Sequence, residues 1–279
     1  MCGSQTSKPL FVYHGAKDKE MKEIKNFLPP MENINMIIEP FGGSFALIRH
    51  LHVEFPNKKF HVNDIDPTII NIYQNMCDKH VNESVITEIK NFLEEINKVN
   101  SKPTGFDYPE ALQTSVKTTC LTEAKKLYDE IKQTHTVASE LFQRVYFNIA
   151  PGLFPQKHVN VNFETLKSFQ QYAHVQFTCG NGVELCEKMK DNEDVFLFLD
   201  PPYLFTDNRW YGKSNFDFDQ LFLFLQKISK IKAKVLFVLE DCILVRCFVE
   251  HHHLVIRGVT NVCYGRSKKK KQHLYVANY

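Results

Sequence analysis

The sequence of 279 residues predicts an α/β fold, a doubly wound and mainly parallel sheet of about seven strands interrupted by a mostly helical insertion. Two observations predict this fold. Short apolar runs alternate with amphipathic helical stretches in both halves of the chain, which is typical of a parallel sheet. Residues 77–163 instead show helical spacing with few strand-like runs, which indicates an insertion between the halves.

The first half contains two strand–helix units. The expected elements are a strand at 36–39, a helix at 44–54, a strand at 60–64 and a helix at 67–76. Asp66 is a good N-cap for the second helix, and Pro67 suits its first turn. This order predicts neighbouring parallel strands.

The insertion and the second half complete the pattern. Within the insertion, helices are expected at 81–99, 121–131 and 137–149. The later strands are expected at 175–178, 194–199, 233–239, 254–258 and 273–278, with helices at 182–189, 217–229 and 242–249. The last two strands are able to pair antiparallel. Residues 1–76 and 164–279 are therefore expected to form one domain around the sheet.

Composition narrows the class of protein. Hydrophobic residues make up 43% and charged residues 24% of the chain, which is ordinary for a globular protein and excludes disorder. The net charge of +2 means that any nucleic-acid surface must be local. No apolar run approaches the ~18 residues of a membrane span, and eight cysteines without a C-x-x-C pair suggest reduced thiols in an intracellular protein without a metal site.

Two motifs stand where strands of an open α/β sheet end, which is where ligands bind in such folds. Gly42 and Gly43 let the backbone come close to a ligand, although a tight strand-to-helix turn explains them as well. Asp64 ends the second strand, a position that takes ribose hydroxyls in nucleoside-binding folds. A solvated acid or a helix cap is the alternative.

The tetrapeptide Asp200-Pro201-Pro202-Tyr203 is the most informative motif. An apolar strand ends in an acid, and two prolines then remove N–H donors. This combination suits an exocyclic amine on a planar base: Asp200 and the Pro201 carbonyl would accept its N–H bonds, and the Tyr203 ring would stack on the base. The alternative is a rigid turn.

With these motifs the chain resembles the Dam-type (D-P-P-Y) N6-adenine-specific DNA methyltransferases, nearly end to end. The segments that carry the resemblance are Tyr13-His14-Gly15-Ala16-Lys17, Glu39-Pro40-Phe41-Gly42-Gly43, Asn63-Asp64-Ile65-Asp66, Asp200–Tyr203 and Leu274–Tyr279. Two positions depart from the family pattern, because Ala16 and Phe45 stand where glycines are usual.

The resemblance implies a Rossmann-like methyltransferase sheet that binds S-adenosylmethionine (AdoMet). Tyr13, Gly15 and Lys17 would contact AdoMet, residues 39–43 would form the loop on its methionine side, and Asp64 would take the ribose. Asp200 to Tyr203 would hold a flipped adenine of double-stranded DNA for attack on the methyl group. Residues 77–163 would be the target-recognition domain.

Two basic or histidine-rich clusters remain. The residues Arg266, Lys268, Lys269, Lys270 and Lys271 are expected to contact nucleic-acid phosphates, with a solvated hairpin tip or a nuclear-import-like run as the alternatives. The run at 251–253 is expected to be a solvated strand edge rather than a metal site. Two other functions stay open: an RNA exocyclic-amine methyltransferase, and a catalytically silent binding or scaffold protein.

Overall fold

The computed structural model describes residues 8–11, 13, 15–100, 123, 125–146, 161–202, 218–264 and 269–279. The chain divides into two compact units. The first comprises Met1–Ser7, Tyr13–Ile70 and His174–Tyr279, and the second comprises Lys8–Val12 and Asn71–Ala173. The second unit thus takes in a short N-terminal segment as well as the stretch expected to be an insertion.

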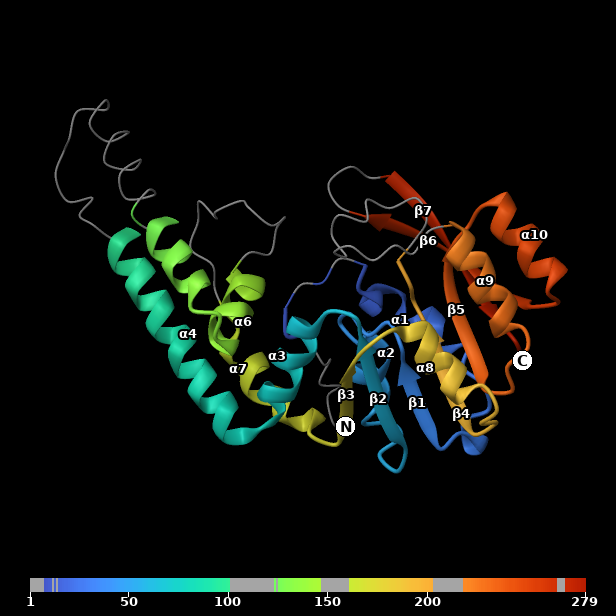
Figure 1. Cartoon of the computed structure of the whole chain (residues 1–279), viewed down its shortest axis with the longest axis horizontal. Helices are drawn as coiled ribbons and strands as arrows, with labels where there is room; N and C mark the ends of the chain where they lie inside the picture. Colours follow the sequence, from blue (N-terminus) through green and yellow to red (C-terminus); the bar gives the residue numbers. More distant parts are fainter. Residues whose placement is uncertain are drawn as a thin grey trace. The chain divides into compact units, whose positions relative to one another are not determined.

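The first unit is built on one seven-stranded sheet with the order β3-β2-β1-β4-β5-β7-β6 (Figure 1). Its strands are β1 (Met36–Glu39), β2 (Lys59–Asp64), β3 (Val175–Cys179), β4 (Val195–Leu199), β5 (Lys234–Glu240), β6 (Val255–Tyr264) and β7 (Lys269–Ala277). The first five are parallel, and β7 runs antiparallel between β5 and β6. This confirms the predicted Rossmann-like α/β class. The strand order reverses between β1 and β4, the switch point at which such sheets bind ligands.

Each face of the sheet carries its own helical layer. The helices α8 (Gly182–Met189), α9 (Phe218–Ile228) and α10 (Ile243–His251) pack on one face. Alternate strand side chains point to the same face. This core contains Ile38, Leu197, Leu199, Val235, Phe237, Leu274 and Val276 from the strands, and Leu221, Phe224, Leu225, Val245 and Val249 from the helices.

The opposite face carries the N-terminal helices. They are the 3₁₀ turn η1 (Lys17–Glu20), α1 (Met21–Lys25) and α2 (Ala46–Leu51). Tyr275 of β7 points to this face, where its ring centroid lies 5.1 Å from that of Phe27. A second 3₁₀ turn, η2 (Met31–Asn33), lies between α1 and β1 in the chain. Within this layer, α1 and α2 hold the turn η1, and with it Lys17, against the sheet.

The second unit is a helical cluster. Its main helices are α4 (Lys79–Asn100), α6 (Val137–Tyr146) and α7 (Phe163–Ser168), followed by the 3₁₀ turn η3 (Phe169–Tyr172). The unit boundary falls within α3 (Pro67–Cys77). Asn82 is fully buried, and its Nδ2 donates to the carbonyl oxygens of Met76 and Leu166 at 2.8 and 2.9 Å. The amide therefore joins the start of α4 to α3 and α7.

The structure corrects two sequence-based expectations and adds one helical segment that was not expected. The helix expected from residue 44 begins at Ala46, because Phe45 adopts a left-handed φ of 41° that cannot belong to an α-helix. His251 ends α10 and His252 is its C-cap, so the expectation of a strand edge at 251–253 was wrong. The helical segment at 17–25 was not predicted at all. In the described part of the chain, no helix is long and apolar enough to cross a membrane.

Candidate functional site

An ion pair joins two of the predicted site residues at the switch point. Lys17 opens η1, and its Nζ lies 2.6 Å from Oδ2 of Asp200, which directly follows β4. The same Nζ donates to the carbonyl oxygen of Gly15 at 2.8 Å. The Lys17 side chain is only 2% exposed, against 20% for Asp200. Lys17 and Asp200, 183 positions apart in sequence, thus form an ion pair that is largely shielded from solvent.

Asp64 and Gly43 form a second contact, at the ends of β2 and β1. The Gly43 N–H donates to Oδ2 of Asp64 at 2.7 Å, and the Asp66 N–H donates to Oδ1 at 2.9 Å. Gly43 has a φ of 47°, and a Cβ there would lie 2.7 Å from Cε1 of Tyr13. The position therefore excludes any side chain, because a Cβ would collide with the Tyr13 ring.

Asn63 braces the strand ends around this contact, a role that the sequence reasoning missed. Its Nδ2 donates to the carbonyl oxygens of Pro40 and Gly180, both at 2.9 Å. Its Oδ1 accepts from the Thr178 hydroxyl at 3.0 Å, and Thr178 in turn lies 2.7 Å from Nε2 of His61. The available signal was the alternation of the polar residues His61 and Asn63 with the apolar residues Phe60 and Val62 along β2.

The loop at 39–43 is fixed by close packing. A Cβ on Gly42 would lie 2.5 Å from Cγ1 of Val62 and 2.9 Å from the backbone carbonyl oxygen of Asn63. The Gly42 N–H donates to that oxygen at 2.7 Å. The Phe41 ring meets Phe224 edge-on at 5.8 Å. The motif thus owes its first glycine, Gly42, to backbone packing, and its aromatic residue contributes to the core.

Glu39 is a buried acid beneath this loop, only 3% exposed. Its Oε1 accepts from the Ile48 N–H in α2 at 2.6 Å. Burial raises the pKa of Glu39 to about 8, a rise that the Ile48 hydrogen bond and the Arg49 charge oppose and the negative charge of Asp200 reinforces. At neutral pH most Glu39 side chains are therefore uncharged.

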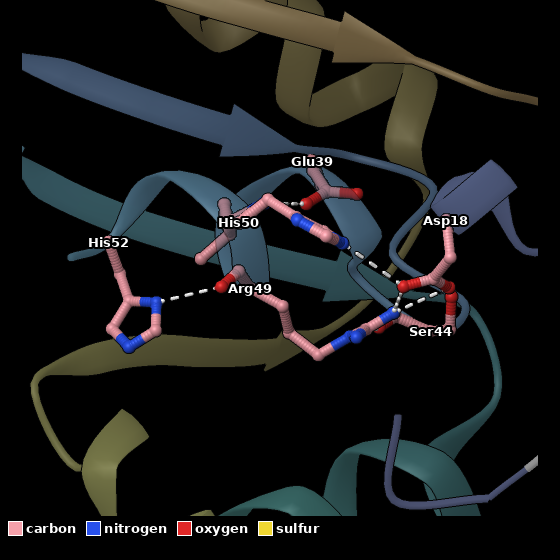
Figure 2. A network of polar contacts seen from close by, with 7 residues as sticks. Asp18, Glu39, Ser44, Arg49, His50 and His52 are labelled. Atoms are coloured by element: carbon pink, nitrogen blue, oxygen red, sulfur yellow. Dashed lines mark hydrogen bonds and ion pairs between the residues drawn. The ribbon is translucent and has the colours of Figure 1, made fainter. Parts of the chain in front are cut away.

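Arg49 and Asp18 form a polar network beside Glu39 (Figure 2). Nη2 of Arg49 lies 2.8 Å from both carboxylate oxygens of Asp18, and Nε donates to the Ser44 carbonyl at 2.8 Å. His50 approaches Asp18 with Nε2 at 3.3 Å. Burial alone would raise the pKa of Asp18, but His50 and Arg49 outweigh it and hold that pKa below its ordinary value. The network ties η1 to the loop that precedes α2.

Glu20, at the other end of η1, is tied to the strand β7. Its Oε2 lies 2.6 Å from Nδ1 of His273 and accepts from the Tyr275 hydroxyl at 2.6 Å. All three side chains are buried. Burial would raise the pKa of Glu20, but the His273 hydrogen bond and the Lys17 charge lower it below its ordinary value. Sequence reasoning missed this cluster too, since its members are some 250 residues apart.

The structure describes only some of the remaining predicted site residues. Pro201 is buried and Pro202 partly buried, whereas Tyr203, Arg266 and Lys268 lie outside the described residues. Residues 269–271 belong to β7, and nothing is described of their side chains. Among the described residues, no three His, Cys, Asp or Glu side chains gather as a metal site.

The fold and the site define an α/β protein of the Rossmann-like class with a cation and two acids where parallel strands end. Residues 13–263 match the model of the D12 class N6 adenine-specific DNA methyltransferases. The match spans most of the chain, and the protein belongs to this family.

Comparisons with known proteins give the following matches. The Type II methyltransferase M.MjaIII of Methanocaldococcus jannaschii is 25% identical over 247 residues, which cover 82% of this chain and 83% of that protein. Among solved structures, the rRNA methyltransferase aviRa from Streptomyces viridochromogenes aligns with a TM-score of 0.37 and 9% identity, over 100% of this chain and 91% of that chain.

Proposed function

We propose that this protein is a site-specific DNA methyltransferase (adenine-specific) that transfers a methyl group from AdoMet to N6 of adenine. Membership of the family supports this reaction. The observation that carries the proposal is the ion pair of Lys17 with Asp200. It sets the residue proposed to bind the cofactor carboxylate beside the residue proposed to bind the target amine.

The residues at the strand ends fit AdoMet. Lys17 supplies a cation for its carboxylate, and the Asp64 carboxylate has about four lone-pair sites for ribose hydroxyls and backbone donors. Because Gly43 has no Cβ, the backbone can lie in contact with the Tyr13 ring, where a Cβ would collide with it. Ile65, next to Asp64, exposes 58% of its surface and offers an apolar contact for a nucleobase. When bound, AdoMet supplies a methyl group on a positively charged sulfur, which is already a strong electrophile.

The work of the protein is then to orient the amine and exclude water. Asp200 and the Pro201 carbonyl accept the two N–H bonds of N6, which raises electron density on the nitrogen and favours attack. A bond forms between N6 and the methyl carbon as the carbon–sulfur bond breaks, and the nitrogen then loses one proton. Because the methylated nitrogen is strongly acidic, Asp200 need only be a weak base.

The target base must leave the duplex to reach this site. Base extrusion costs a few kcal/mol, and stacking on Tyr203 returns ~1–3 kcal/mol. We assign phosphate contact to Arg266 and residues 268–271, because five positive charges fall within the six residues 266–271. That unit is proposed to recognise the target sequence, and the protein to act on double-stranded DNA inside the cell.

Transfer of a labelled methyl group tests the proposal. The protein is incubated with methyl-labelled AdoMet and with duplex DNA, single-stranded DNA or RNA, and the modified nucleoside is identified. N6-methyladenine in DNA is expected, and its loss in D200A. The matched control D241N changes an acid that follows the neighbouring strand β5 and pairs with Arg246, so it should retain activity. Transfer to RNA alone would refute the proposal, as would a failure to bind AdoMet.

A further inference from the structure

The turn that carries Lys17 is fastened at two further residues. The turn η1 has only four residues, Lys17–Glu20, and no side chain caps its N-terminus. Short isolated helical turns are unstable in water, so outside contacts must supply the order. Asp18 is held by Arg49, and Glu20 is held by the strand β7.

We infer that Glu20 is a positioning residue for Lys17: by binding His273 and Tyr275, it fixes the orientation of η1 and thereby places the Lys17 ammonium for the AdoMet carboxylate. The inference rests on the proposed function. It makes β7, the last strand in the chain, a support of the cofactor site.

Geometry supports this coupling. A 3₁₀ helix has three residues per turn, so the side chains of Lys17 and Glu20 lie on the same side of η1. The two hydrogen bonds on Oε2 of Glu20 are both 2.6 Å long, and Glu20 is 3% exposed while His273 and Tyr275 are fully buried. Short bonds to a charged acceptor away from water are the strong kind. They leave the turn little freedom to rotate.

Electrostatics adds to the geometry. The negative charge on Glu20 is felt by Lys17, since the Lys17 charge helps to lower the pKa of Glu20. Lys17 also pairs with Asp200. A loss of the Glu20 charge would therefore both release the turn and remove an acid that attracts the ammonium group.

The test compares two tyrosines at the end of the chain. Y275F removes the hydroxyl that donates to Glu20, while the control Y279F removes a hydroxyl that donates to the Phe27 carbonyl at 2.6 Å and does not touch η1. Calorimetry gives the Kd for AdoMet, and kinetics give its KM and kcat. We expect Y275F to raise Kd and KM about three- to tenfold, with a much smaller change in kcat, and Y279F to change neither.

A double-mutant cycle separates positioning from general damage. E20Q should weaken AdoMet binding about tenfold or more in the native background. In a K17M background it should add no more than about twofold, because the residue it positions is gone. Equal losses in both backgrounds would overturn the inference. If E20Q does not fold, Y275F combined with K17M decides in the same way.

The outcomes distinguish the inference from the proposed function. A native protein that binds no AdoMet would refute both. Unchanged AdoMet affinity in K17M would overturn the roles of Lys17 and Glu20 while methyl transfer to adenine still stood. Equal effects of Y275F and Y279F on Kd would overturn the role of Glu20 alone.

Discussion

Glu39 should make the stability of this protein fall as pH rises toward neutrality. Its folded-state pKa is about 8, against an ordinary value of 4.5. Between these pH values the folded protein keeps a proton that the unfolded chain has lost. Stability from this group is therefore fully present below pH 4.5, declines above it, and is lost once the pH passes the folded-state pKa.

The magnitude follows from one proton. A difference of one bound proton changes the free energy of unfolding by ~1.4 kcal/mol per pH unit. Between pH 5.5 and 7.5, Glu39 should thus remove about 2.5 kcal/mol of stability. E39Q stays neutral, retains an oxygen that accepts from the Ile48 N–H, and should not show this loss.

Urea unfolding of both proteins at pH 5.5, 6.5 and 7.5 measures the effect. Comparing the two proteins cancels the titration of every other group. We expect the free energy of unfolding of E39Q, relative to that of the native protein, to be about 2.5 kcal/mol higher at pH 7.5 than at pH 5.5. Most of the difference between the two proteins at pH 7.5 is therefore expected to be absent at pH 5.5. Parallel pH curves would refute the reasoning, because Glu39 would then be ionised in the folded protein.

Three further substitutions probe the loops and the network. G43A should lower stability by ~1–2 kcal/mol for the left-handed backbone alone and weaken AdoMet binding in calorimetry, whereas G180A, whose Cβ would sit at 3.5 Å from its nearest neighbour, should be tolerated; equal effects would contradict this account. N63A should cost ~2–4 kcal/mol in urea unfolding because two backbone carbonyls lose their donor, and a loss below ~0.5 kcal/mol would show that the brace is dispensable. R49M should cost ~2–3 kcal/mol by removing the Arg49 partner of the Asp18 carboxylate, which then keeps its contact with His50, and should raise the Asp18 pKa, as followed by NMR; an unchanged pKa would speak against the ion pair.

Elements with strong periodicity could be predicted from the sequence. The helix expected at 182–189 has the observed bounds of α8, and β1 was expected at its observed residues. The structure also brings Lys17 to Asp200 and Gly43 to Asp64. These residues lie at strand ends or in short motifs, where local pattern and topology together determine their position.

Tertiary contacts explain what could not be predicted. Phe45 occupies a left-handed conformation where the family usually has glycine, and its fully buried ring packs edge-on against Phe177 at 5.5 Å. Local propensity argues against that conformation, and only the packing reveals why a bulky residue stands there. The anchors of η1 are equally invisible in sequence, because Glu20 and His273 share no local pattern.

The anchoring of Glu20 by β7 also bears on biosynthesis. Its partners come from residues 253 and 255 positions further along the chain. While the ribosome is still making the intervening segments, the five parallel strands are able to assemble, but the turn η1 then has its Asp18–Arg49 anchor without the second anchor at Glu20. If Glu20 positions Lys17 as inferred, full affinity for the methyl donor arises only after residues 273–275 emerge, and unfinished or C-terminally clipped copies would retain much of the sheet but bind the donor more weakly.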